Sequence, residues 1–496
     1  MAEHLRSLII ILVLATIFFA YAGRVATVII RRDHFTSRRN LWIGITLAAF
    51  LPANFWVYAF ITILLLLYVN RRETNPPALF FFILFVLPIA YAQIPGFGLI
   101  NFFFDLSHAR ILALFILLPA YFVLVRDSNA LPFGRALPDK FLAAYMFLTA
   151  ILFLRDSSFT ETMRQTAYLF MDVFLPYFVI SRSLRDLQTF KDALMSLVVA
   201  IMLVALLAVF ESYKQWLLYL PLVNILELKQ GASGYLARDG FLRVMSSAGF
   251  SISLGYLMVV GIGIYLFLQR AIENKFQRRL GMVLLSVGLL VPWSRGPWVG
   301  AVLLLIVFIA TGRNSFKRLL GFALVGMLTL ALLPILPGGE RIINLLPIIG
   351  TTEKGTIDYR SDLITVSMIN IQRNPWFGSV NYLEAPEWEP LYQNHLIDIV
   401  NTYFQIALEN GLVALGLFVG FFASVVLSIY MSMHSLLLKD SDEYLLGRAL
   451  LATLLAILFI IGTVSNITII PIVYWSVAGL GMGYVQMVRR GSPAKQ

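Results

Sequence analysis

The sequence predicts an all-α polytopic integral membrane protein, with roughly 12–15 transmembrane helices and one long extracytoplasmic loop that contains an amphipathic helix. Of its 496 residues, 59% are hydrophobic and only 13% are charged, whereas a soluble globular protein is about 45–50% apolar and about 25% charged. Such a chain cannot cover a globule with polar groups, which excludes a water-soluble enzyme. Apolar runs near the ~20-residue spanning length recur along it, and they are continuous rather than alternating, which favours helices over barrel strands.

The basic residues supply the third observation, because they stand in small clusters between apolar stretches that are mostly long enough for two passes. Cytoplasmic loops retain Lys and Arg, so each cluster is predicted to be cytoplasmic and each break between clusters to lie on the opposite face. The same rule explains the net charge of +11, and nucleic-acid binding is not expected because the basic residues do not gather on one face. The clusters lie at 31–39, 71–72, 126–140, 182–191, 270–279, 313–318, 439–448 and 489–490.

Four segments follow from this pattern. We expect N-terminal transmembrane helices over 1–190, core transmembrane helices with arginine-bearing breaks over 191–337, an extracytoplasmic loop over 338–400, and C-terminal transmembrane helices over 401–490. The loop holds four Lys or Arg against eight Asp or Glu, a net-acidic balance that fits the extracytoplasmic side.

The first apolar stretch has two interpretations. Residues 8–19 are apolar and follow Arg6, so we expect a retained first helix that runs to about residue 30. Ala20-Tyr21-Ala22 has the small-x-small form of a cleavage site, and a signal peptide is therefore the alternative.

Metal and thiol chemistry find little support in the sequence. Cysteine is absent, which removes disulfides, thiol nucleophiles and Cys-based metal sites. Asp440-Ser441-Asp442 has the Asp-x-Asp form of a metal-dependent glycosyltransferase, but it follows Lys439 in a predicted cytoplasmic loop. We expect a solvated turn there, and no metal and no cofactor.

Arg295 is the first candidate site residue, since ionisable residues inside or beside a span are costly and usually functional. It lies in the segment Trp293-Ser294-Arg295-Gly296-Pro297-Trp298 between two apolar stretches. Gly296 and Pro297 are predicted to break the helix and to leave backbone N–H groups beside the guanidinium, a combination that suits phosphate or pyrophosphate. The alternative is an interfacial turn with tryptophan anchors and a snorkelling arginine.

Arg243 is the second candidate. It is predicted to stand just before a helix that starts near residue 244, whose positive dipole end favours an anion, and Arg238 is close by. The alternation of faces puts Arg243 and Arg295 on the same side, so together they predict a pyrophosphate clamp. An arginine that merely anchors a helix end is the alternative.

The loop over 338–400 holds the remaining candidates. Arg360 opens an amphipathic stretch that ends near Gln372 and is predicted to be a helix lying on the membrane surface. Beyond it, His395 and Asp398 would share a helix face at i and i+3. A histidine supported by a carboxylate is a reasonable general base for a sugar hydroxyl, and a surface histidine without a role is the alternative. Three aromatic residues, which either stack on sugar rings or belong to a membrane belt, are Tyr382, Trp388 and Tyr392.

These features, in this order, resemble the O-antigen ligase/Wzy-type polymerase superfamily of bacterial envelope glycosyltransferases, over about residues 190–430. Four segments carry the resemblance: 243–255, 294–300, 360–378 and 401–413. The ligases of this family usually carry His directly before the Asn of their Asn-x-Tyr motif, where this chain has Val400. The difference favours a polymerase over a ligase, and it leaves the general base open between His395 and Asp398.

The resemblance implies a metal-independent mechanism at the periplasmic face of the bacterial inner membrane. A glycan on undecaprenyl pyrophosphate would enter from the bilayer, and an acceptor hydroxyl would attack the anomeric carbon with help from His395 or Asp398. The acceptor would be a glycan or lipid A-core. The resemblance also allows for partner proteins that take part in polysaccharide assembly. Pyrophosphate binding is implied for Arg243, Arg295 and Arg360, and a supporting role for Ser294, Gly296, Asn401 and Tyr403.

Three activities stay open at this point. A polymerase of exopolysaccharide or O-antigen extends a glycan, whereas an O-antigen ligase transfers the finished glycan to lipid A-core or protein. A lipid-linked oligosaccharide flippase or another transporter belongs to a different class, and it would place its charged residues near the bilayer midplane.

Overall fold

The computed structural model describes residues 1–98, 101–155, 158–229, 232–238, 240–335, 354–391, 397–467 and 469–491. In this part of the chain, helices dominate and the only sheets are two short antiparallel ribbons. Strand β1 (Tyr91–Pro95) pairs with β2 (Phe102–Ser107), and β3 (Ala237–Arg238) pairs with β4 (Phe241–Leu242). The prediction of an all-α polytopic membrane protein is confirmed.

The α-helices, in chain order, are α1 (Glu3–Ala26), α2 (Arg32–Phe50), α3 (Phe55–Asn70), α4 (Pro76–Ile83), α5 (His108–Leu112), α6 (Leu118–Arg126), α7 (Leu137–Leu152), α8 (Phe159–Leu169), α9 (Leu175–Ser183), α10 (Leu187–Lys214), α11 (Leu220–Ile225), α12 (Ser251–Leu268), α13 (Lys275–Leu290), α14 (Arg295–Ala310), α15 (Ser315–Leu332), α17 (Lys354–Arg373), α18 (Thr402–His434), α19 (Asp442–Ile461) and α20 (Ile469–Gly491). Two π-helical turns, η1 (Ala113–Leu117) and η2 (Phe170–Phe174), interrupt longer helices, and the 3-10 turns are η3 (Ser246–Ala248), η4 (Gln269–Ala271), η5 (Leu333–Ile335), η6 (Tyr382–Glu384) and η7 (Pro386–Leu391). Side-chain oxygens that accept backbone N–H groups begin many of these helices, among them those of Asn54, Asn75, Asp186, Asn274, Asn401 and Ser441.

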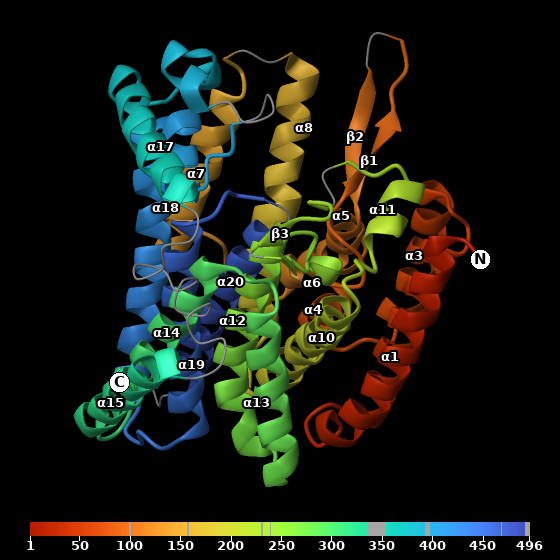
Figure 1. The fold of residues 1–496 in the computed structure, drawn as a ribbon, viewed down its shortest axis with the longest axis vertical. Helices are drawn as coiled ribbons and strands as arrows, with labels where there is room; N and C mark the ends of the chain where they lie inside the picture. The colour runs from red at the N-terminus through yellow and green to blue at the C-terminus, as the bar shows by residue number, and fades with distance from the viewer. Residues whose placement is uncertain are drawn as a thin grey trace.

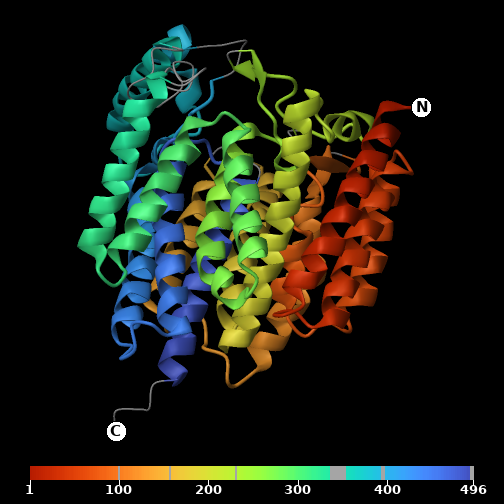
Figure 2. The same cartoon turned by 60° about the horizontal axis from the view of Figure 1, so that its bottom comes forward.

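Eight of the described helices are long and apolar enough to cross a membrane, and the apolar helices α3 and α14 are shorter. With 16 residues each, these two reach about 24 Å. The expectation of roughly 12–15 spans depends on such short or broken helices, and it stays a prediction. Figure 2 shows the long helices side by side, with the start of α1 at one end of the bundle and the end of α20 at the other.

Side-chain contacts bring the predicted cytoplasmic clusters together at one end. Asp442 pairs with Lys191 at 2.7 Å and with Arg270 at 3.4 Å, and Asp440 pairs with Arg313 at 3.3 Å. Ser441 caps α19 between the two aspartates. The Asp-x-Asp segment therefore lies in an ion-paired corner beside three basic clusters.

Hydrogen bonds also connect residues in or near the predicted breaks between basic clusters. The indole N–H of Trp216 donates to Glu3 at 3.0 Å, and the guanidinium of Arg238 donates to the carbonyl of Trp293 at 2.7 Å. Tyr91 and Lys229 exchange backbone hydrogen bonds. These contacts join segments that the alternation of basic clusters had assigned to one face.

This arrangement gives a direct topology test, because the chain has no native cysteine. A single cysteine at exposed Phe97, between β1 and β2, is expected to react with a membrane-impermeant maleimide added to spheroplasts. A single cysteine at exposed Glu273, in a basic cluster, is expected to react only after lysis. The opposite labelling pattern would overturn the assignment of faces.

Helix α12 lies in the middle of the core and sets the position of α14. Nearly all of its residues are buried, and it packs on α10, α13, α14 and α19 (Figure 1). At Gly255 a side-chain carbon would lie 2.8 Å from the ring of Pro297, so glycine allows the first turn of α14 to rest directly on α12.

Candidate active site

The break before α14 differs in detail from the one expected. Helix α13 ends at Leu290 and α14 begins at Arg295, and Trp293 between them has a left-handed φ of 51°. The expectation that Gly296 and Pro297 break the helix is wrong, because both lie in the first turn of α14. Proline is tolerated there since the first N–H groups of a helix have no intrahelical acceptor. The free N–H groups and the positive dipole end of α14 are therefore at Arg295.

The segment around Arg243 also differs. A helix was expected to start near residue 244, but α12 begins at Ser251. Ser246 and Gly249 have left-handed φ values of 47° and 78°, which an α-helix does not permit. Arg243 instead follows β4, and its backbone N–H donates to Leu236 at 2.8 Å.

Glu211, which the sequence analysis missed, holds this segment in place. Its buried carboxylate, near the end of α10, accepts backbone N–H groups from Leu218 at 2.8 Å, Met245 at 3.2 Å and Ser246 at 2.8 Å. Because two of these donors lie within three residues of Arg243, the carboxylate fixes the course of the chain just after that arginine.

Replacing Glu211 with alanine is expected to displace Arg243, because a buried N–H group without an acceptor costs about 1–3 kcal/mol. We expect the purified protein to bind pyrophosphate about tenfold more weakly, and Glu211→Gln, which keeps one acceptor oxygen, to lie between the variant and the wild type. Glu3→Ala, which removes an exposed carboxylate at the same end of α10, is the matched control. Wild-type binding by Glu211→Ala would refute this positioning role.

Arg243, Arg295 and Arg360 come together at one pocket, although they lie on segments far apart in the sequence. Its described lining consists of four arginines, with Ser294, Gly296 and Ile252; the fourth arginine is Arg238. Each guanidinium is permanently charged and presents a fork of N–H donors that matches phosphate oxygens. We call this site the arginine pocket.

Gly296 connects the arginine pocket to the segment between α19 and α20. A side-chain carbon on Gly296 would lie 2.7 Å from the Thr463 hydroxyl. The first turn of α14 therefore lies close to Thr463, in the segment between α19 and α20.

Asp398 is not in the described lining of the arginine pocket, but its hydrogen bonds connect it to residues that lie close in the sequence to residues at that pocket. The Ser465 hydroxyl, two residues from Thr463, donates to its exposed carboxylate, and the hydroxyl of Tyr359, the neighbour of Arg360, donates to its backbone carbonyl at 3.2 Å. Burial, and then the charge of Asp398, raise the pKa of Tyr359, so that hydroxyl stays protonated as a donor. His395 lies outside the described residues. The i, i+3 relation expected for the pair therefore stays a prediction, and the described residues 397–400, which precede α18, are not helical.

Asn401 and Tyr403 hold the start of α18 in place through hydrogen bonds. The Asn401 side chain accepts the backbone N–H groups of Tyr403 at 2.9 Å and Phe404 at 3.2 Å, which caps the helix. The Tyr403 hydroxyl donates to the carbonyl of Leu458 at 2.7 Å. Neither residue is in the described lining of the arginine pocket, so they lie at the start of the helix that follows Asp398.

The other two segments that carry the family resemblance, 360–378 and 401–413, contact each other through backbone hydrogen bonds. The N–H of Leu412 donates to the carbonyl of Pro375 at 2.7 Å, and that of Ser379 donates to Leu408 at 2.8 Å. Gly378 and Gly411 have left-handed φ values of 66° and 79°, and a side chain on either would collide with the facing backbone. This contact holds the end of α17 against α18.

Arg155 completes that contact and was also missed. Its guanidinium donates to the carbonyls of Phe377 at 2.8 Å, Gly378 at 3.1 Å and Glu409 at 3.0 Å. The signal was present in the sequence, because Arg155 is an arginine outside the basic clusters at 126–140 and 182–191, between two apolar stretches.

The amphipathic helix expected from Arg360 is α17, which begins earlier, at Lys354. Leu363 is buried in a small core with the start of α18, whereas Ile364 and Met368 are exposed. Trp388 is fully buried and its indole donates to the carbonyl of Tyr382 at 2.7 Å. Buried Trp388 fits neither of the two roles left open for it, stacking on sugar rings or a membrane belt, and Tyr392 lies outside the described residues.

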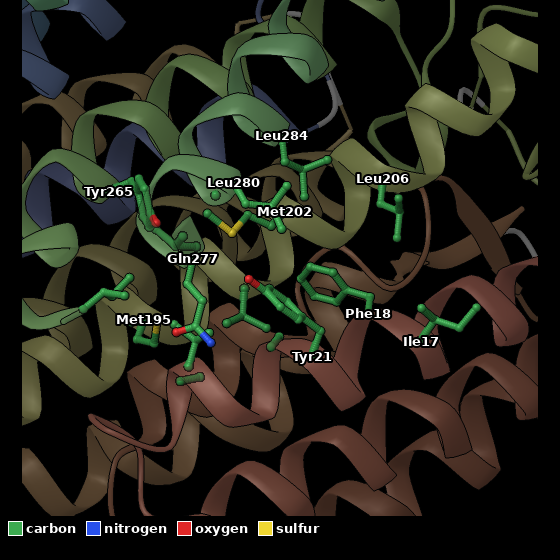
Figure 3. A pocket seen from close by; sticks show the side chains of 17 residues that line it. Ile17, Phe18, Tyr21, Met195, Met202, Leu206, Tyr265, Gln277, Leu280 and Leu284 are labelled. Carbon is green, nitrogen blue, oxygen red and sulfur yellow. The ribbon is translucent and has the colours of Figure 1, made fainter. Parts of the chain in front are cut away.

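An apolar cavity of about 300 Å³ lies between α1, α10 and α13. Figure 3 shows Phe18 and Tyr21 of α1 opposite Met202 of α10 and Leu280 of α13. Its lining is almost entirely hydrocarbon, which suits an aliphatic chain. Both α10 and α13 lead from this cavity toward the arginine pocket, since Glu211 lies near the end of α10 and Arg295 follows α13.

Comparison with known families agrees with the resemblance seen in the sequence. Residues 280–419 match the family model described as O-antigen ligase, Wzy_C. The matched region contains Arg295, Arg360 and Asp398, and it includes the contact between the end of α17 and α18. No curated protein matches the chain.

Proposed function

Because residues 280–419 carry the O-antigen ligase domain, we propose that this membrane protein is a glycosyltransferase whose donor is a glycan on undecaprenyl pyrophosphate. More specifically, it polymerises exopolysaccharide or O-antigen. The observation that carries the proposal is the arginine pocket, where four guanidinium groups meet beside the first turn of α14. That concentration of fixed positive charge and N–H donors is complementary to a pyrophosphate.

The reaction is a displacement at the anomeric carbon of the donor glycan. An acceptor hydroxyl oxygen forms a bond to this carbon while the bond from the carbon to the pyrophosphate oxygen breaks. The electron pair leaves with undecaprenyl pyrophosphate, and the hydroxyl proton passes to Asp398 or to His395. Arginines that hold the pyrophosphate stabilise the charge that develops on the leaving group.

Asp398 is supported as the base by its position. Ser465 donates to its carboxylate, and Tyr359, the neighbour of Arg360, donates to its backbone carbonyl. Its exposed carboxylate is able to accept a proton from a bound hydroxyl. The undecaprenyl chain has an apolar surface to follow along α10 and α13 into the membrane (Figure 3).

Two features distinguish this proposal from its alternatives. Val400 stands where related ligases usually carry histidine, which favours a polymerase over transfer to lipid A-core or protein. The arginines gather at helix ends and in a break, whereas a transporter places its charges near the bilayer midplane. The positive-inside pattern supports the bacterial inner membrane with the site facing the periplasm.

A deletion strain complemented with the wild type or with Arg295→Ala tests the function, with lipid-linked glycan and polysaccharide length measured together. A polymerase predicts that the variant leaves single repeats on the lipid and loses long polymer. Long polymer that stays on the lipid would instead identify a ligase. Arg313→Ala, which removes an exposed arginine at the other end of the bundle, is the control, and an unchanged profile for Arg295→Ala would contradict the pyrophosphate site.

A further inference from the structure

A second polar cavity, of about 320 Å³, lies between the β1–β2 ribbon, α8 and the residues around the start of α20. Figure 1 shows the ribbon and α8 standing next to each other at one end of the molecule. We call it the hairpin cavity. Its polar lining includes Asp105, Arg110, Gln165, Tyr168, Asp172 and Asn466.

The hairpin cavity is held in shape by its own charged residues. Arg110 pairs with Asp172 at 2.8 Å, donates to the carbonyl of Asp105 at 2.7 Å, and lies 3.5 Å from the ring centre of Tyr168. The backbone N–H of Asp105 donates to the Tyr168 hydroxyl at 2.7 Å. These contacts join β2, α5 and α8 to the π-helical turn η2, so the cavity is a built structure.

Its chemistry matches that of a saccharide. Sugars present hydroxyl groups that carboxylate and amide oxygens accept, and Asp105, Gln165 and Asn466 offer such oxygens. The Oδ1 atom of Asp105 is buried and has no hydrogen-bond partner among the described residues, although a buried acceptor of this kind is normally satisfied. The cavity is also lined by Tyr91, whose ring has the apolar surface on which a sugar face packs.

The local backbone points to function as well. Asp172 lies in the π-helical turn η2, and a second π-helical turn, η1, follows the helix that carries Arg110. Such turns are rare and are frequent at functional sites. Placing a charged residue within an apolar helix likewise costs free energy, and such residues mark functional cavities.

The hairpin cavity lies next to the proposed reaction centre. Thr463 contacts the first turn of α14 at Gly296, Ser465 binds the carboxylate of Asp398, and Asn466 lines the hairpin cavity. The three steps from Thr463 to Asn466 span at most about 11 Å. The short segment from Thr463 to Asn466 therefore separates the arginine pocket from the hairpin cavity, with Asp398 bound to its middle.

We infer that the hairpin cavity is the subsite for the acceptor saccharide, an inference that rests on the proposed function. The acceptor lies in the cavity with its attacking hydroxyl toward Asp398, while the pyrophosphate of the donor lies in the arginine pocket. The donor sugar is then between the two, and the proton of the acceptor hydroxyl has a carboxylate beside it. This arrangement assigns donor and acceptor to different sides of one chain segment.

Steady-state kinetics of the full chain in nanodiscs test the assignment. The donor is the lipid-linked repeat, and the acceptor probe is a soluble oligosaccharide released from the host polysaccharide by mild acid. Asp105→Asn and Gln165→Ala are expected to raise the KM for the oligosaccharide at least about tenfold and to leave the KM for the donor unchanged. Asp33→Asn, at an exposed aspartate beside a basic cluster, is the matched control. A raised donor KM would show that the cavity holds donor sugars and would overturn the inference, as would unchanged kinetics.

A binding measurement keeps the inference testable even when no transfer occurs. In a chain without native cysteine, the single variant Ile89→Cys, at an apolar residue of the cavity lining, reports on the cavity through its rate of labelling by a maleimide. The oligosaccharide is expected to slow this labelling, and inorganic pyrophosphate is not. Labelling that the oligosaccharide does not change would overturn the acceptor subsite, whereas failure of pyrophosphate to bind wild type would instead count against the proposed function.

Discussion

Replacing Arg295 with alanine is expected to lower the rate of glycan transfer by roughly 10²–10³-fold, the usual effect of removing one donor that stabilises a developing anion. Arg295 lies at the first turn of α14 and is in the described lining of the arginine pocket. The purified protein, measured with saturating lipid-linked donor, gives this rate directly. Arg243→Ala is expected to show an effect of similar size, since both residues line the arginine pocket.

Lysine variants separate charge from geometry at the same two positions. Arg295→Lys keeps the positive charge but loses the fork of donors that binds two phosphate oxygens, so we expect a rate between those of the alanine variant and the wild type. Arg313→Ala is expected to match the wild type. A wild-type rate for both Arg243→Ala and Arg295→Ala would contradict the proposed pyrophosphate site.

Replacing Gly411 with alanine is expected to prevent stable folding of the domain around α17 and α18. A side-chain carbon there would collide with the carbonyl of Trp376, and the left-handed φ of 79° adds strain of about 1–3 kcal/mol for any other residue. Because the facing atoms are backbone, the segment over 375–378 would have to move away from α18. The measurement is the thermal unfolding temperature of the purified variant, together with its yield as a monodisperse peak.

Gly416→Ala provides the matched control on the same helix. Apart from the neighbouring backbone of its own helix, no atom of the described residues lies within 4 Å of the position that its side-chain carbon would take. Alanine is the better helix former by about 0.5–1 kcal/mol. We therefore expect equal or higher stability for this variant. Equal stability of Gly411→Ala and Gly416→Ala would show that the contact between the two motifs does not hold α17 in place.

The sequence predicted the class of protein and one shared face for Arg243 and Arg295 because both follow from simple energetic rules, whereas the grouping of Arg360 with them was implied by the family resemblance. The apolar spans and the basic clusters, which are predicted to be cytoplasmic, determine which breaks are predicted to lie on the same face of the membrane. A charged residue inside an apolar context must then have a partner or a function. Arg243, Arg295 and Arg360 satisfied that condition, and the structure places all three at one pocket.

The same rule misjudged arginines that the fold buries. Arg38 belongs to a predicted cytoplasmic cluster, yet its side chain is fully buried and pairs with Glu73 at 2.9 Å and with Asp192 at 2.6 Å. Arg182 is likewise fully buried against Asp139. The partners lie on distant helices, and helical periodicity within one segment does not reveal them.

The positioning residues were missed for a related reason. Glu211 and Arg155 act on backbone groups that come close only after the helices pack, so no sequence motif marks the pairing. The helix start near residue 244 and the helix break at Gly296 and Pro297 were misplaced, because the left-handed residues that shape the two turns, Ser246 and Trp293, carry no sequence signal of their own. Packing therefore decided the local geometry where propensity alone did not.

The central claim is that this protein forms a glycosidic bond and releases undecaprenyl pyrophosphate. The most direct test is a reconstitution of the purified chain in liposomes with a defined lipid-linked repeat, in which released undecaprenyl pyrophosphate and glycan length are measured together. The account predicts one undecaprenyl pyrophosphate released for each bond formed by the wild type, and neither product above background for Arg295→Ala. Lipid-linked glycan that changes leaflet with no bond formed and no lipid released would contradict it, and would identify a transporter.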